Sequence, residues 1–295
     1  MAKISVVMCC YNSERYIKET IDSVLGQTFQ DFEFIIWNDG STDSTKAIVE
    51  SYHDSRIQLF SDVNRGEGMA AQLACRHVTA KYIARIDSDD VWLPEKLALQ
   101  YDYMESHPQT VLLSCPVIYI DDKSVELGRS FPVTKVSYLN KSIEKVNFFP
   151  HSGSIYRTEL YQKVGGYNNV RFFQDCLLFW KMSDYGDLAL FPKPLIKYRL
   201  LAGSVDHRIE RSAYKSIIFA YKDKIYKEKG TNETDIKLFN TIYDLIERIN
   251  NEKFVYKQNI QNRLYNALCI IMSADCAYKI MIYLKNFIGF FRFSL

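Results

Sequence analysis

The chain has 295 residues, 47% of them hydrophobic and 24% charged, a composition typical of a soluble globular protein with one or two buried cores. These values exclude disorder over most of the chain, and the few glycines (12) and prolines (7) exclude a collagen-like or low-complexity protein. The seven scattered cysteines include no CxxC pair. They therefore support neither a zinc ribbon nor a disulfide framework, and we expect a reduced, cytosolic compartment.

The first 90 residues alternate between strand and helix patterns. Ile4–Cys10 is a nearly unbroken apolar run, as in a strand buried on both faces of a sheet. Asn12 or Ser13 can cap the helix that follows, which Gly26 closes. The patterns predict strands at 4–10, 32–37, 57–60 and 82–86, with helices through 17–24, 47–52 and 69–78 between them.

Three consecutive strand–helix units predict an α/β fold with a mostly parallel sheet flanked by helices. Ligands of such sheets bind beyond the carboxyl ends of the strands. Those ends carry Tyr11-Asn12, Asp39 and Asp87–Asp90. Three polar clusters are therefore expected at one edge of the sheet.

The remaining elements are predicted with shorter patterns. A polar, irregular stretch at 121–150 indicates an acceptor-side loop. Elsewhere we predict helices at 95–104, 159–164 and 175–185, strands at 111–120 and 155–157, and only helix from about 212 onward.

Asp87-Ser88-Asp89-Asp90 places three carboxylates within four residues at a strand end. Such like charges repel, and a bound divalent cation relieves the repulsion. Carboxylate oxygens suit Mg²⁺ or Mn²⁺, ions that proteins commonly share with substrate phosphates. The alternatives are a solvated acidic turn or the nucleophile motif of a dehalogenase-type phosphatase, although that motif belongs at a first strand, whereas this one follows three strand–helix units.

Asp39 stands at a strand end, before a glycine turn. Its carboxylate can accept the imide N–H of uracil, and Tyr11 can stack on a base. The alternatives are a local Asx-turn or helix cap for Asp39 and packing at the sheet edge for Tyr11.

An ordered series of motifs strongly resembles the inverting family 2 glycosyltransferases, which have the GT-A fold. The series consists of Ile4–Asn12 with Ile17–Thr28, Asn38-Asp39-Gly40-Ser41-Thr42-Asp43, Asn64-Arg65-Gly66, Tyr82–Asp90 with Leu93–Leu97, and Gln174-Asp175. The resemblance covers about the first 205 residues. It implies a GT-A glycosyltransferase domain at 1–205, followed by a helical C-terminal region at 206–295.

The resemblance also implies a role for particular side chains. Tyr11 and Asp39 would bind uracil, Asp87 would hold the ribose or the metal environment, and Asp89 would ligate Mn²⁺ or Mg²⁺. Asp175 would be the catalytic base, with the N-cap of its helix as the alternative role. The expected substrate-binding set is completed by Asn12, Glu14, Arg65, Ser88 and Gln174.

The chain departs from the family pattern at several positions. Ala70-Ala71-Gln72 stands where the family often shows Ala-Arg-Asn, and Gln174 replaces a glutamate beside the expected base. A histidine that usually follows the Tyr-Arg pair is absent after Tyr198-Arg199. If that histidine normally helps to hold the diphosphate or the metal, Arg199 or water must take its place.

The charge of the chain is unevenly distributed. Residues 1–205 have a net charge of −3, and residues 206–295 have a net charge of +5. A basic amphipathic helix at 278–295 would suit an anionic membrane surface, so we expect peripheral contact with the cytosolic face of the membrane. The alternative is a terminal helix packed on the catalytic domain or on a second copy of the chain. A nucleic-acid partner is disfavoured, because acidic residues interrupt the basic ones.

These patterns together predict a metal-dependent, inverting glycosyltransferase. It would move a sugar from a nucleotide-sugar donor, a UDP-sugar by the resemblance, to a hydroxyl of a glycan or lipid-linked glycan in bacterial surface-polysaccharide synthesis. The alternatives are a catalytically silent nucleotide-sugar-binding protein and, less favoured, the phosphatase.

Overall fold

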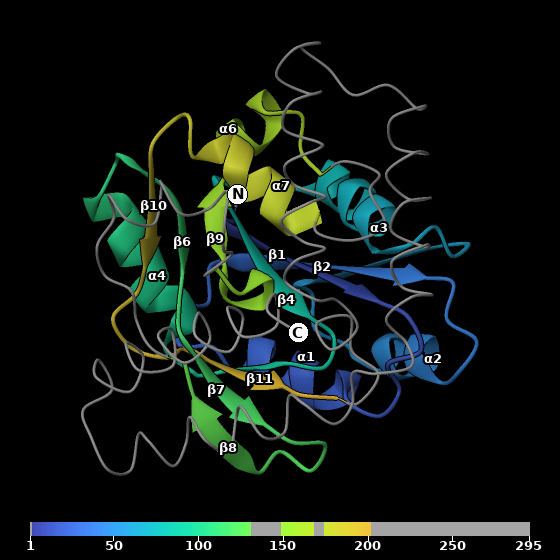
Figure 1. Ribbon diagram of the computed structural model, residues 1–295. Helices are drawn as coiled ribbons and strands as arrows, with labels where there is room; N and C mark the ends of the chain where they lie inside the picture. Colours follow the sequence, from blue (N-terminus) through green and yellow to red (C-terminus); the bar gives the residue numbers. More distant parts are fainter. Residues whose placement is uncertain (1, 131–148, 168–173, 202–295) are drawn as a thin grey trace, which may run out of the picture. The chain divides into compact units, whose positions relative to one another are not determined.

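The computed structural model describes residues 2–130, 149–167 and 174–201 (Figure 1). The helical region predicted for 206–295 lies outside these residues. Residues 131–148 of the polar loop predicted at 121–150 also lie outside them.

A seven-stranded sheet forms the centre of the described part, with strand order β10-β6-β9-β4-β1-β2-β3 (Figure 1). Its first four strands in sequence pair with one another in parallel, as predicted. β9 is antiparallel to both β4 and β6, which makes the sheet mixed but mostly parallel. The strands are β1 (Ile4–Cys10), β2 (Phe32–Asp39), β3 (Ile57–Asp62), β4 (Tyr82–Asp87), β6 (Thr110–Ser114), β9 (Ile155–Arg157) and β10 (Asp187–Leu190).

Helices pack on both faces of this sheet, and alternate strand residues supply the two cores. Val7 of β1 belongs to the core under α3, α6 and α7, whereas Val6 and Met8 belong to the core under α1, α2 and α4. This arrangement explains why β1 is apolar at nearly every position. The helices are α1 (Ile17–Leu25), α2 (Thr45–Glu50), α3 (Glu67–Ala74), α4 (Lys96–Ser106), α6 (Thr158–Lys163) and α7 (Gln174–Met182), with 3₁₀ turns at Cys75–His77 and His151–Gly153.

A second sheet of four strands has the order β5-β11-β7-β8. The single strand predicted at 111–120 is wrong, because β6 and β7 are separate strands in different sheets. Pro116 lies between them, and a proline cannot donate a backbone hydrogen bond within a continuous strand. The strands of this sheet are β5 (Val91–Trp92), β7 (Val117–Ile120), β8 (Glu126–Arg129) and β11 (Ile196–Arg199).

The start of α1 also differs from the prediction. Its N-cap residue is Tyr16, and no side chain caps the helix. Asn12 instead accepts a hydrogen bond from the Thr42 amide, and its backbone has a φ of 49°. The prediction that Asn12 or Ser13 caps this helix by its side chain is therefore wrong, whereas Gly26 ends the helix as predicted.

Among the helices of the described ranges, none combines the length and the apolar character that a bilayer crossing requires.

Candidate active site

The backbone register brings three of the predicted polar positions to one edge of the large sheet. Cys9 of β1 is opposite Asp87 of β4, and Cys10 is opposite Asn38 of β2. Tyr11 directly follows Cys10, and Asp39 directly follows Asn38, so both lie at nearly the same level as Asp87. The tyrosine is half exposed at 50%, whereas Asp39 is 4% exposed.

Asp39 holds the loop that leads from β3 into α3. Its two carboxylate oxygens accept the backbone N–H groups of Arg65 and Gly66 at 3.0 and 2.9 Å. Gly40 next to it has a φ of 74°, and a Cβ there would lie 2.6 Å from the Asn64 nitrogen. Asp39 therefore does not form the local Asx-turn that the sequence allowed. It fixes a loop 26 residues further along the chain.

The Arg65 side chain lies on the same loop but is turned to a different partner. Its Nε donates to Asp62 Oδ2 at 2.6 Å, and about half of the side chain is exposed. The ion pair with Asp62 raises the pKa of the Arg65 guanidinium, which stays charged. The arginine therefore offers a positive charge at the sheet edge.

Asn12 and Glu14 connect two loops at the sheet edge. Asn12 Oδ1 accepts the Thr42 amide at 2.8 Å, and Glu14 Oε2 accepts the Ser44 amide at 2.9 Å. In return, the Glu14 amide donates to Asp43 Oδ2. Both predicted substrate-binding side chains thus tie the β1–α1 loop to the β2–α2 loop, and Tyr11 stands on the loop that they fix.

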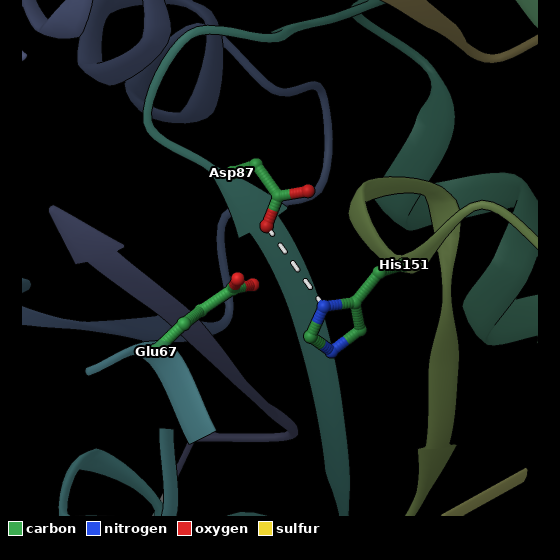
Figure 2. Close-up of side chains that lie close together, drawn as sticks. All are labelled: Glu67, Asp87 and His151. Atoms are coloured by element: carbon green, nitrogen blue, oxygen red, sulfur yellow. Dashed lines mark ion pairs between the residues drawn. The ribbon is translucent and has the colours of Figure 1, made fainter. Parts of the chain in front are cut away.

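Asp87 lies among charged and polar groups that the sequence analysis did not single out. Its Oδ1 is 3.4 Å from Arg85 Nη2 and 3.9 Å from His151 Nδ1. Glu67, in the first turn of α3, points its carboxylate toward the same place (Figure 2). The ligand atoms of Glu67, Asp87 and His151 all lie within 4.8 Å of one another. This is the one group of possible metal ligands found within the described ranges.

His151 does not fit a metal in this cluster. Its Nε2 accepts from Arg85 Nε at 3.2 Å, so the proton of the neutral ring is on Nδ1, the atom that faces Asp87. Burial and the charge of Arg85 lower the pKa of His151 well below its usual value, which keeps the ring neutral. Asp87 and Glu67 remain as hard oxygen donors that suit Mn²⁺ or Mg²⁺.

Asp87-Ser88-Asp89-Asp90, the acid motif, is held beyond Asp87 by its backbone and by buried contacts. Ser88 Oγ lies 2.7 Å from Ser13 Oγ, and Thr20 Oγ1 donates to the Ser88 carbonyl. Asp90 is 1% exposed. Burial raises the pKa of Asp90 well above its ordinary value, and the nearby charges of Asp89 and Asp87 raise it further. The cluster around Glu67 does not include Asp89, whose role as the metal ligand remains a prediction.

Arg199 does not replace the missing histidine as a ligand of the diphosphate or the metal. It is 2% exposed, and its guanidinium donates to the carbonyls of Asp89 and Asp121 and to the side chains of Ser124 and Glu19. Because these protein acceptors engage all three guanidinium nitrogens, Arg199 is part of the structure that supports the acid motif.

Gln174 and Asp175 begin α7, which packs on the same core as His151. The Phe179 ring lies 6.1 Å from the His151 ring, so the helix rests on the group that faces Asp87. Gln174 is 3% exposed, and Asp175 belongs to the first turn of α7. Asp175 therefore lies within the helix, which contradicts the N-cap alternative. Residues 168–173, which precede it, lie outside the described ranges.

Sequence reasoning missed Glu67, Arg85 and His151. Glu67 follows the predicted Asn64-Arg65-Gly66 motif and could have been suspected from its place in the first helical turn. Arg85 lies inside the Tyr82–Asp90 motif, but the sequence carries no signal that links it to His151. His151 belongs to none of the motifs, and the pairing of β4 with β9 brings its 3₁₀ turn beside Asp87.

Comparisons with known proteins decide the family. Residues 5–165 match the family model described as Glycosyl transferase family 2. The chain belongs to glycosyltransferase family 2. The Bacillus subtilis (strain 168) protein EpsE, named as a glycosyltransferase, is 32% identical over 174 residues, which make up 57% of this chain and 61% of EpsE. The chain therefore spans less than two thirds of that relative. The amylovoran biosynthesis glycosyltransferase AmsE of Erwinia amylovora is 27% identical, over 75% of this chain and 85% of AmsE.

Two solved structures show the same fold. The structure of S. aureus TarS residues 1–349 in complex with UDP-GlcNAc has a TM-score of 0.62 at 21% identity, covering 90% of this chain and 79% of that one. The mannosyltransferase PcManGT of Pyrobaculum calidifontis, in complex with GDP-Man and Mn²⁺, has a TM-score of 0.59 at 19% identity, covering 83% and 69%. These likenesses confirm the predicted GT-A architecture.

Proposed function

We propose that the protein is an inverting glycosyltransferase that uses a nucleotide-sugar donor, with a UDP-sugar as the preferred class. The observation that carries the proposal is the meeting of Tyr11, Asp39 and Asp87 at one sheet edge in a family 2 chain. UDP-GlcNAc is bound in the TarS structure, although GDP-Man is bound in PcManGT. The base-binding groups of this chain must therefore choose between uracil and guanine.

Recognition of the base would use Tyr11 and Asp39. The half-exposed Tyr11 ring supplies a stacking surface. Each Asp39 oxygen already accepts one backbone N–H, and each carboxylate oxygen has a second lone pair that can accept the uracil imide. Because the loop at Arg65 and Gly66 fixes this carboxylate, it would need no rearrangement when the base binds.

A divalent cation fits the acidic groups at the sheet edge. Asp87 and Glu67 provide oxygen donors, and Asp89 would complete the set by the resemblance. When bound, such an ion supplies Lewis-acid stabilisation of the charge that develops on the leaving diphosphate. The neutral His151 ring faces Asp87, with its Nδ1 lying 3.9 Å from Asp87 Oδ1.

Proton removal from the acceptor hydroxyl is assigned to Asp175. A carboxylate placed beside the attacking hydroxyl accepts its proton as the new glycosidic bond forms. A single displacement of this kind, with the nucleoside diphosphate leaving from the opposite face, inverts the anomeric configuration. The name of AmsE, an amylovoran biosynthesis enzyme, supports a glycan or lipid-linked glycan as the acceptor and a bacterial surface polysaccharide as the product.

Calorimetric titration with UDP and GDP, each with Mn²⁺ and with EDTA, tests the donor assignment. We expect UDP to bind more tightly than GDP, and Mn²⁺ to strengthen UDP binding by at least 10-fold. A preference for GDP would overturn the assignment of uracil as the base. UDP binding that is unaffected by EDTA would overturn the proposed role of the cation. The phosphatase alternative is disfavoured, because Asp87 ends the fourth strand rather than the first.

A further inference from the structure

Arg199 binds the acid motif through both its backbone and its side chain. Its backbone N–H donates to Asp90 Oδ1 at 2.8 Å, and its Nε donates to the Asp89 carbonyl oxygen, also at 2.8 Å. These two bonds hold consecutive residues of the motif from the end of β11. The peptide that carries the Asp89 side chain is therefore fixed from one side.

The other guanidinium nitrogens anchor Arg199 to two further elements. Nη2 donates to Glu19 Oε2 of α1 at 2.6 Å, and Nη1 donates to the Asp121 carbonyl and to Ser124 Oγ, both at 3.0 Å. The Tyr16 ring lies 4.4 Å from the guanidinium carbon. Because only 2% of the residue is exposed, this network holds one geometry in an environment of low dielectric constant.

We propose that Arg199 is a positioning residue, which fixes the Asp89 backbone and the Asp90 carboxylate and so presents the acid motif to the cation and the diphosphate. The proposal rests on the proposed function for its cation and its nucleotide. The planar guanidinium makes its four bonds in directions set by its own geometry, whereas a lysine ammonium has three donors on a flexible stem. Its positive charge is paired with the Glu19 carboxylate, whose Oε2 lies 2.6 Å from Nη2.

Arg157 provides a matched control at the far side of the sheet. Like Arg199 it ends a strand, donates to backbone carbonyls (those of Thr110, Met104 and His107) and lies over a tyrosine ring. Its partner in the sheet is Tyr82, the first residue of β4, whereas the acid motif begins at the last residue of that strand. Arg157→Lys should therefore cost stability without disturbing the motif.

Two measurements test the proposal on Arg199→Lys and Arg157→Lys. The first is amide hydrogen exchange of residues 87–92 in the absence of any ligand. The second is the ratio of the UDP dissociation constants in EDTA and in Mn²⁺. We expect Arg199→Lys to accelerate exchange in 87–92 and to reduce the Mn²⁺ ratio by about 10-fold or more, while UDP affinity in EDTA stays unchanged. Arg157→Lys should lower the unfolding temperature and change neither measurement.

Unchanged exchange and an unchanged Mn²⁺ ratio in folded Arg199→Lys would overturn the proposal. If that variant does not fold, Glu19→Gln replaces it, because this change removes the charge that anchors Nη2 and leaves Arg199 in place. Faster exchange in 87–92 then supports the proposal, and wild-type exchange overturns it. A wild-type protein that binds no UDP under either condition would refute the proposed function, whereas the exchange measurement would still decide the role of Arg199.

Discussion

Replacing Lys96 by methionine should remove a pH dependence of stability that comes from a buried amine. Lys96, in the first turn of α4, is 0% exposed. Its Nζ donates to Gln100 Oε1 at 2.7 Å and lies 3.8 Å from the centre of the Trp92 ring. Burial lowers the pKa of Lys96 from 10.5 to about 7, and no carboxylate contributes to this change in pKa.

The sign of the effect follows from proton binding. Between pH 7 and 10.5 the unfolded chain holds the Lys96 proton and the folded chain releases it, so stability rises with pH in this window. The slope is about 1.4 kcal/mol per pH unit. From pH 7.5 to 9.5 the stability of the wild type should therefore increase, relative to Lys96→Met, by about 2 to 3 kcal/mol. Cys115 nearby has a pKa raised to about 11 by burial, but it is present in both proteins and cancels in the difference.

Urea unfolding of both proteins at half-unit pH intervals measures this difference. The variant also leaves Gln100 Oε1 without its donor, which costs about 1–3 kcal/mol but does not vary with pH. Lys81→Met is the matched control, because the Lys81 side chain is 54% exposed. The difference in unfolding free energy between this variant and the wild type should not change with pH over this range. If the difference in unfolding free energy for Lys96→Met is also independent of pH, the Lys96 amine keeps an ordinary pKa in the folded protein.

Three further substitutions test the sheet edge. Asp39→Asn should lower the free energy of unfolding by about 1.5–3 kcal/mol, because an amide cannot accept both loop N–H groups; unchanged urea unfolding would contradict this. Asp89→Ala should abolish the strengthening of UDP binding by Mn²⁺ in calorimetry, and a wild-type response would remove Asp89 from the metal site. Asp175→Asn should slow transfer by roughly 10²–10⁴ with UDP affinity retained, whereas an equal loss of UDP binding would indicate a structural role.

The sequence predicts the first half of the fold well because its signals there are long. β1 to β4 are strands of six to eight residues with an apolar segment in each, separated by helical periodicity, and all four occur where they are expected. β5, β8, β10 and β11 have only two to four residues each, which is too short for a periodic pattern. β9 was predicted as a strand, but its antiparallel insertion between β4 and β6 depends on contacts with residues about 40 to 75 positions earlier in the chain.

The candidate site divides in the same way. Asp39 and Asp87 could be placed at one edge because strand ends in a parallel sheet align. The partners of these side chains could not be predicted, since they come from loops whose shape is fixed by tertiary contacts. Asn12 and Glu14 join two loops, and His151 reaches Asp87 from a 3₁₀ turn far along the chain.

Turnover of nucleotide sugars tests whether the protein is an inverting glycosyltransferase. The protein would be incubated with a panel of UDP- and GDP-sugars, Mn²⁺ and a polyprenyl-phosphate-linked glycan fraction. The released nucleotide would be quantified, and the configuration of the new anomeric centre would be determined by NMR. We expect release of UDP from a UDP-sugar, loss of this release in EDTA, and a product whose anomeric configuration is opposite to that of the donor. Retention of the donor configuration, or nucleotide binding without turnover of any donor, would contradict it.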